Sequence, residues 1–81
     1  MPPANVVDME TTLAEALTTG LIVRVTRRVE GEKLIDVGQA WSRTSSSLRI
    51  RELTARRYVD LPLDEVTAVE IIGVFLKDYG A

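Results

Sequence analysis

The chain contains neither cysteine nor histidine. Without cysteine there are no disulfides, thiolate metal sites or thiol nucleophiles. Without histidine the chain lacks both the commonest general base and the commonest metal ligand. We therefore expect a protein that is not an enzyme and that uses no cofactor and no metal ion.

Long hydrophobic runs are also missing. No apolar stretch of the sequence approaches the roughly 20 residues that a membrane-spanning helix needs. Residues 1–5 lack the basic and apolar regions of a secretory signal. These two features predict a cytoplasmic protein that does not contact a membrane.

What the chain does contain is enough for one small folded domain. It has 81 residues, of which 46% are hydrophobic, and this content favours a packed core over disorder. The formal net charge of −2 gives no overall attraction to nucleic acid. The charge is unevenly distributed, however, because nine basic and four acidic residues lie between Arg24 and Arg57. The chain therefore has a basic middle and acidic ends.

Residues 1–7 open with a Pro-Pro pair and are expected to form a flexible arm. From Asp8 the spacing of Met9, Leu13, Ala16 and Leu17 is typical of one face of an amphipathic helix. Gly20 is well placed to end this helix.

The segment from Leu21 to Val29 alternates in the manner of a strand, with Val23 and Val25 on one face and Arg24 and Arg28 on the other. Arg27 falls on the inward face, so a bulge or a barrel rim is expected there. Residues 30–32 (Glu-Gly-Glu) predict a tight hairpin turn.

A second strand is expected over 33–41. Its alternation places Ile35, Val37 and Trp41 on one face, which we interpret as the inward one, opposite Leu34 and Ala40. Gly38 indicates a bend of the kind that small barrels use at corners.

Three further strands follow a polar loop at residues 42–47. The third spans 48–53 with Leu48 and Ile50 inward, the fourth spans 56–61, and the fifth spans 66–72. Asp64 and Glu65 mark a polar corner between the last two, where turn capping explains adjacent carboxylates better than catalysis does.

A helix followed by five short strands predicts a mainly β protein, namely a small five-stranded barrel of the Sm-like or SH3-like type with an N-terminal α-helix. The domain is expected over 8–73. Residues 74–81 then form an apolar C-terminal tail that has no obvious place in the barrel.

Two Sm-like families are similar to this chain. The helix, the hairpin at residues 30–34 (Glu-Gly-Glu-Lys-Leu) and residues 63–67 (Leu-Asp-Glu-Val-Thr) resemble the Rho-binding antiterminator family, Rof, over roughly residues 12–70. This resemblance implies a protein that binds the termination factor Rho and blocks its RNA-binding site.

The other family is the WYL domain, which is similar in residues 13–17, 23–25 and 57–66. The Trp-Tyr-Leu triplet of that family is absent here, since Trp41 is followed by Ser42 and Arg43. A shared fold explains both similarities at least as well as a shared function does.

Outward arginines are the main candidates for binding a partner. If the first and third strands are neighbours or meet round the barrel, their arginines form a patch suited to RNA phosphate or to an acidic protein surface, and Tyr58 adds a stacking face. The alternative is that they are solvated and paired with acidic residues across strands. The partner-binding candidates are Arg24, Arg28, Arg43, Arg49, Arg51 and Tyr58.

Interface candidates are Trp41, Phe75, Leu76 and Tyr79. Tryptophan dominates many interface hot spots, although burial preferences favour a core position for Trp41. The apolar tail either pairs with another chain or folds back over the barrel.

The sequence thus favours a non-catalytic binding module in transcription regulation that contacts a protein, either Rho or another nucleic-acid-associated protein. One alternative is a direct RNA- or DNA-binding protein that uses the outward arginines. Another is a structural or adaptor subunit, viral or cellular, that forms a homo-oligomer.

Overall fold

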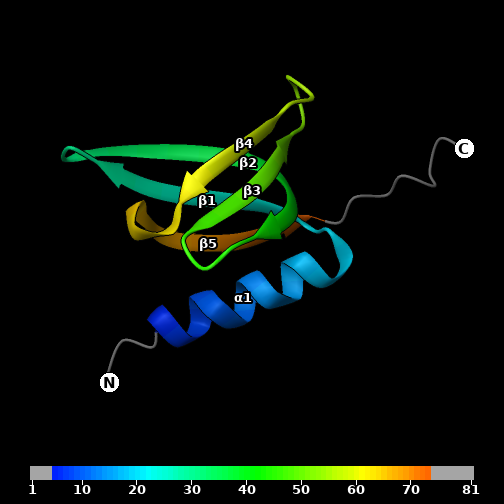
Figure 1. Ribbon diagram of the computed structural model, residues 1–81, viewed down its shortest axis with the longest axis horizontal. Coiled ribbons are helices and arrows are strands. Elements are labelled where there is room, and N and C mark those ends of the chain that lie inside the picture. The colour runs from blue at the N-terminus through cyan, green and yellow to red at the C-terminus, as the bar shows by residue number, and fades with distance from the viewer. Residues whose placement is uncertain (1–4, 74–81) are drawn as a thin grey trace, which may run out of the picture.

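The computed structural model describes residues 5–73 of the chain and shows one helix beside a strongly bent antiparallel sheet (Figure 1). The helix begins at Asn5 rather than at Asp8. The C-terminal candidates Phe75, Leu76 and Tyr79 lie outside the described residues. The elements are α1 (Asn5–Thr19), β1 (Ile22–Val29), β2 (Glu32–Arg43), β3 (Ser47–Glu52), β4 (Tyr58–Pro62), the short 3-10 helix η1 (Leu63–Glu65) and β5 (Val66–Gly73).

The five strands form a single sheet in the order β4-β3-β2-β1-β5. Within residues 5–73, hydrogen-bonded ladders join neighbours in that order, and η1 connects the two edge strands. The structure therefore confirms a mainly β fold with five antiparallel strands and an N-terminal helix. The sheet it shows is open, and closure into a barrel stays a prediction.

The helix ends where the sequence predicts. Gly20 adopts a φ of 70°, and the N–H of Leu21 donates a hydrogen bond of 2.9 Å to the carbonyl oxygen of Ala16. Glycine reaches this left-handed conformation without steric cost, and the 6→1 bond caps the last turn. The chain can then reverse into β1, so that α1 packs against β5 and β2.

The first hairpin is also as predicted. Glu30 and Gly31 form a two-residue turn in which both have positive φ, and Val29 pairs with Glu32. Such turns match the right-handed twist of the strands that they join. The pairing register of β1 with β2 follows directly from this turn.

The bend of β2 depends on Gly38. A Cβ atom at this position would lie 2.6 Å from the carbonyl oxygen of Arg51, so the backbones of β2 and β3 approach too closely for any side chain. One half of β2 pairs with β1 and the other half with β3, and Gly38 takes part in both ladders.

The core lies between the concave face of the sheet and α1. It is built from aliphatic side chains, and the buried ones on the strands alternate with exposed neighbours, as a half-buried strand requires. Its buried members are Leu13, Ala16, Val23, Val25, Ala40, Leu48, Ile50, Leu61 and Val66.

The predicted inward face of β2 is wrong. Ile35, Val37 and Trp41 are exposed, whereas Gly38 and Ala40 are buried. Register explains the difference, since Ile35 faces outward beside Thr26 and Val37 beside Arg24. Next to the bend, the inner side carries the small residues Gly38 and Ala40.

The polar loop is shorter than the predicted range 42–47. β2 continues to Arg43 and β3 begins at Ser47, so three residues connect them. The hydroxyl of Thr44 accepts hydrogen bonds from the backbone N–H groups of Ser46 and Ser47 at 3.2 and 3.1 Å. The threonine side chain therefore organises the turn.

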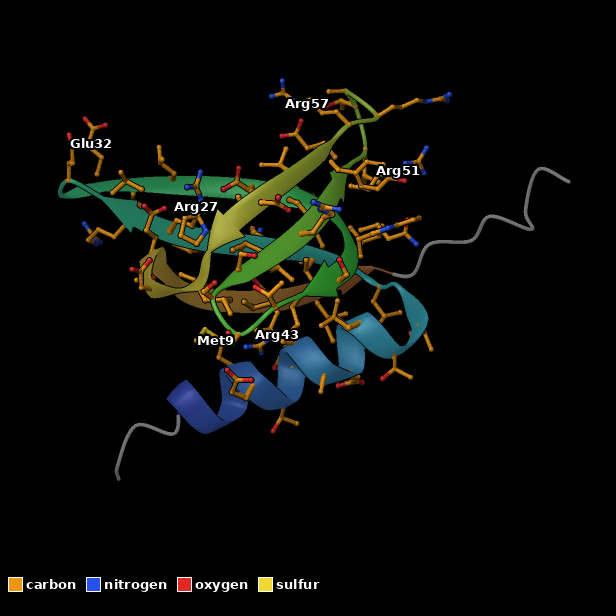
Figure 2. All side chains as sticks on the ribbon, viewed as in Figure 1. Met9, Arg27, Glu32, Arg43, Arg51 and Arg57 are labelled. Carbon is orange, nitrogen blue, oxygen red and sulfur yellow. The ribbon has the colours of Figure 1, made fainter. Side chains whose placement is uncertain are left out.

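Arg27 lies on the inward face beside a bulge, as predicted, because the β1–β5 register shifts between Thr26 and Arg27. Its guanidinium donates to Asp36 at 2.8 Å and to Glu65 at 3.0 Å. This cluster, seen at Arg27 in Figure 2, ties η1 to the β1–β2 hairpin. The expected capping of the corner is not seen: η1 has no side-chain cap, and Glu65 pairs with Arg27 instead.

Neither α1 nor η1 has the length and apolar content needed to cross a membrane.

Candidate functional site

The sheet does not bring the predicted arginine pairs onto neighbouring strands. β2 lies between β1, which carries Arg24 and Arg28, and β3, which carries Arg49 and Arg51. The arginines therefore line one convex face in two separate groups.

Most of these arginines already have a carboxylate partner. Arg24 pairs with Glu70 on the adjacent strand β5. Arg43 reaches α1, where its Nη1 atom lies 2.6 Å from Oε1 of Glu10. The Arg24 pair agrees with the interpretation that outward arginines are paired with acidic residues across strands. Arg43 lies opposite the buried Leu48, on the side of the sheet that faces α1, so it is not an outward arginine. Both interactions reduce the positive charge offered to a partner.

The best-formed pair joins β3 to β4. Arg49 donates two hydrogen bonds to Asp60, from Nε at 2.8 Å and from Nη2 at 3.2 Å. These bonds lower the pKa of Asp60 below its ordinary value. The same hydrogen bonding raises the pKa of Arg49, so this pair stays ionised at neutral pH.

Two of the predicted arginines differ from the others. Arg28 donates to the carbonyl oxygen of Gly31 at 3.1 Å, within its own hairpin. Neither Arg28 nor Arg51 has a carboxylate within ion-pair distance among residues 9–73. Arg51 is opposite Tyr58 on β4 and opposite Gln39 on β2, on the outer face of the sheet.

Trp41 lies beside Tyr58, and both are exposed. Their ring centroids are 5.1 Å apart, with an edge-on angle of 61° between the planes. Trp41 is 47% exposed and Tyr58 is 51% exposed. The interpretation of Trp41 as a core residue is therefore wrong, because two large aromatic rings face solvent together.

The position of Trp41 follows from the alternation of β2, in which Gln39 faces outward and Ala40 is buried. Its indole therefore faces outward and meets Tyr58 from β4. The β2–β3 register shifts between Ala40 and Ser42, so Trp41 has no direct partner on β3.

We call the group formed by Gln39, Trp41, Arg51 and Tyr58 the aromatic–arginine surface. It is continuous across β2, β3 and β4, and the exposed Val37 extends it along β2. An aromatic pair beside an arginine is the composition of an interface hot spot. Edge-to-face aromatic rings also make a favourable contact with each other in the absence of a partner.

Sequence reasoning named Trp41, Arg51 and Tyr58 as candidates but did not place them on one surface, although a signal for it was present. Once residues 30 and 31 are recognised as a two-residue turn, Arg24 must face the same way as Val37. Because Arg24 faces outward, Val37 must face outward too. Alternation along the strand then places Gln39 on the same outer face.

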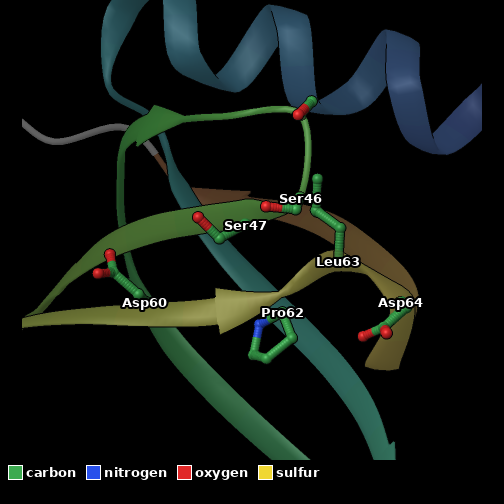
Figure 3. Close-up of a pocket in the computed structure, with 7 residues that line it drawn as sticks. Ser46, Ser47, Asp60, Pro62, Leu63 and Asp64 are labelled. Carbon is green, nitrogen blue, oxygen red and sulfur yellow. The ribbon is translucent and has the colours of Figure 1, made fainter.

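A hollow lies at the end of β4 away from Tyr58 (Figure 3). It is an open depression of about 530 Å³, lined by Ser45, Ser46 and Ser47 and by Asp60, Pro62, Leu63 and Asp64. Of its two carboxylates, that of Asp60 accepts hydrogen bonds from Arg49. In the described part of the chain, no group of acidic side chains is arranged to hold a metal ion.

Comparison of the chain with protein-family models and with curated proteins finds no match.

Proposed function

We propose that this protein is a non-catalytic binding module that docks a partner protein on the aromatic–arginine surface. The observation that supports this most directly is the exposure of Trp41 and Tyr58 as a contacting pair on one face. Exposed aromatic pairs bury a large apolar area on binding at little entropic cost, because each ring has only two rotatable bonds.

We take transcription control as the setting and the termination factor Rho as the partner. This part of the proposal rests on the resemblance of residues 12–70 to the Rof family. The open, strongly bent sheet with α1 below it is compatible with the Sm-like barrel of that family, whose closure would need β4 and β5 to meet.

A protein partner is favoured over nucleic acid because of the ion pairs. Binding to a nucleic acid depends on cations that are free to contact phosphates. Arg24, Arg43 and Arg49 are each held by a carboxylate. Direct RNA or DNA binding remains the second candidate, since Trp41, Tyr58 and Arg51 would also suit stacked bases.

The test is titration of purified Rho with the full chain and two variants. Trp41→Ala and Tyr58→Ala should each weaken the interaction by about tenfold or more, as loss of a hot-spot ring does. Leu34→Ala is the matched control, because Leu34 is an exposed apolar residue (38%) away from this surface. Wild-type affinity in both aromatic variants would overturn the assignment of the surface, and absence of any Rho binding would overturn the choice of partner.

A further inference from the structure

The turn between β3 and β4 forms a second recognition feature beside the aromatic–arginine surface. A hollow of about 290 Å³ opens there, lined by Arg51, Glu52, Leu53 and Arg56. Figure 2 shows Arg51 and Arg57 at this end of the hairpin, far from the β1–β2 turn at Glu32.

Positive charge at this hollow is only partly neutralised. The one carboxylate in its lining belongs to Glu52, which accepts a 2.8 Å hydrogen bond from Nε of Arg57. Arg51 and Arg56 have no carboxylate within ion-pair distance among residues 9–73. The hollow therefore keeps an excess of guanidinium groups, in contrast to the paired Arg24 and Arg49 on the sheet.

Arg56 occupies a backbone position that favours glycine. Its φ is 54°, in the left-handed region, and the turn is held by hydrogen bonds from Arg56 N–H to Glu52 O (3.1 Å) and from Glu52 N–H to Arg57 O (2.8 Å). A side chain at this φ carries a steric cost that glycine avoids. Arginine at this position costs backbone stability and places a cation at the rim of the hollow.

Apolar surface borders these cations. Leu53 is 46% exposed in the turn, and Tyr58 lies across from Arg51. Guanidinium groups form short, bidentate hydrogen bonds with carboxylates, and the leucine and tyrosine side chains offer contact to an aliphatic group. The hollow therefore offers both charged hydrogen bonds and apolar contacts within one turn.

We propose that this hollow binds an acidic segment of a partner protein. Aspartate or glutamate side chains of that segment pair with Arg51 and Arg56, and an adjacent apolar side chain packs on Leu53 and Tyr58. The inference rests on the proposed function, because that function assigns this side of the molecule to a partner protein. Nucleic acid is less suited, because the lining also includes the carboxylate of Glu52 and the exposed leucine side chain of Leu53.

The experiment uses the full chain and a short synthetic peptide of glutamate with interspersed leucine. Trp41 is the only tryptophan and belongs to the adjoining surface, so its emission reports binding of a tryptophan-free probe. A lysine–leucine peptide of equal length and a single-stranded oligouridylate are titrated in parallel. We expect a saturable change in emission with the acidic peptide alone, weakened by added salt.

The Arg56→Gly variant tests peptide binding separately from the stability of the fold. The substitution should weaken peptide binding about tenfold while leaving the melting temperature unchanged or higher, because glycine relieves the left-handed backbone. Lys33→Ala is the matched control, since it removes one exposed positive charge from the far hairpin and should alter binding by less than about twofold.

Three results would overturn the inference: no saturable signal with the acidic peptide, equal weakening by Lys33→Ala, or tighter binding of the oligouridylate. The peptide measurement does not involve Rho. Loss of Rho binding would therefore count against the proposed partner alone, and loss of peptide binding with Rho binding intact would count against the acidic segment alone.

Discussion

The cross-strand pair of Arg49 and Asp60 changes the pH at which the carboxyl group of Asp60 takes up a proton. Both side chains are exposed, so the pair is screened by solvent and its main effect is on the pKa of Asp60. Hydrogen bonds from Arg49 lower that pKa in the folded protein. The pair therefore favours the folded state above the ordinary carboxyl pKa of about 4, and this contribution is lost as the pH falls through the lower folded-state value.

We predict that Arg49→Gln returns the pKa of Asp60 to its ordinary range. The measurement is an NMR titration of the Asp60 side-chain carboxyl carbon in the wild-type and variant proteins. Arg24→Gln serves as the control, because Arg24 pairs with Glu70 and not with Asp60. Identical midpoints in wild type and Arg49→Gln would show that the hydrogen bonds to Asp60 do not form in solution.

Arg27 differs from the surface arginines in its burial. Its side chain is 17% exposed and that of Asp36 is 16% exposed, while Glu65 supplies a second carboxylate. Hydrogen bonding to Asp36 raises the pKa of Arg27 above its ordinary value. Removing the cation would leave two acidic groups close together with little access to water.

We predict that Arg27→Met lowers the free energy of unfolding by about 2 kcal/mol, since it leaves partly buried carboxylates unpaired. Urea denaturation at neutral pH measures the loss. The matched variant Arg24→Met breaks an exposed pair and should cost less than about 1 kcal/mol. Equal losses in the two variants would mean that burial of the Arg27 cluster contributes nothing.

At the scale of elements, the bend of β2 controls where the aromatic–arginine surface lies. Gly38 allows the backbones of β2 and β3 to approach, and the outward alternation of β2 continues past this point to Trp41. Close to the bend, the inner side of β2 carries glycine and alanine.

We predict that Gly38→Ala destabilises the fold by about 1–3 kcal/mol, because its Cβ would lie 2.6 Å from the carbonyl oxygen of Arg51. Thermal unfolding followed by circular dichroism measures the effect. Gly73→Ala is the control, since a Cβ there meets Ile22 at an ordinary 3.7 Å. A Gly38→Ala protein as stable as wild type would contradict the close approach of β2 and β3.

Local signals in the sequence predicted several of these elements well. Gly20 ends α1, residues 30 and 31 form the first turn, and the alternation of Leu48 and Ile50 correctly marks the inner face of β3. Each of these features depends on neighbouring residues only. Short-range chemistry is therefore enough to predict them.

Features that depend on distant residues were harder to predict. Trp41 was placed in the core because large apolar residues usually lie there, but which face of β2 is inward depends on its pairing with β1 and β3. The arginines were grouped without knowing that β2 separates β1 from β3. Strand order and bulge positions result from tertiary pairing, which periodicity along one strand does not contain.

At the scale of the whole molecule, the arginines differ in their partners and surroundings. Carboxylates hold Arg24, Arg43 and Arg49, and Arg28 donates to a carbonyl oxygen in the β1–β2 hairpin. Arg51 and Arg56, which have no carboxylate partner among residues 9–73, lie beside exposed aromatic and aliphatic groups. The net charge of −2 adds no long-range attraction to nucleic acid. A local protein contact is the interaction that this arrangement favours.

The most direct test of the proposed function measures readthrough of a Rho-dependent terminator by transcription in a purified system. Wild-type protein should increase readthrough in proportion to its concentration, the double variant Trp41→Ala/Tyr58→Ala should lose that effect, and Leu34→Ala should retain it. Termination that is unchanged by the wild-type protein, or readthrough that persists in the double variant, would contradict the claim that the exposed aromatic pair docks Rho.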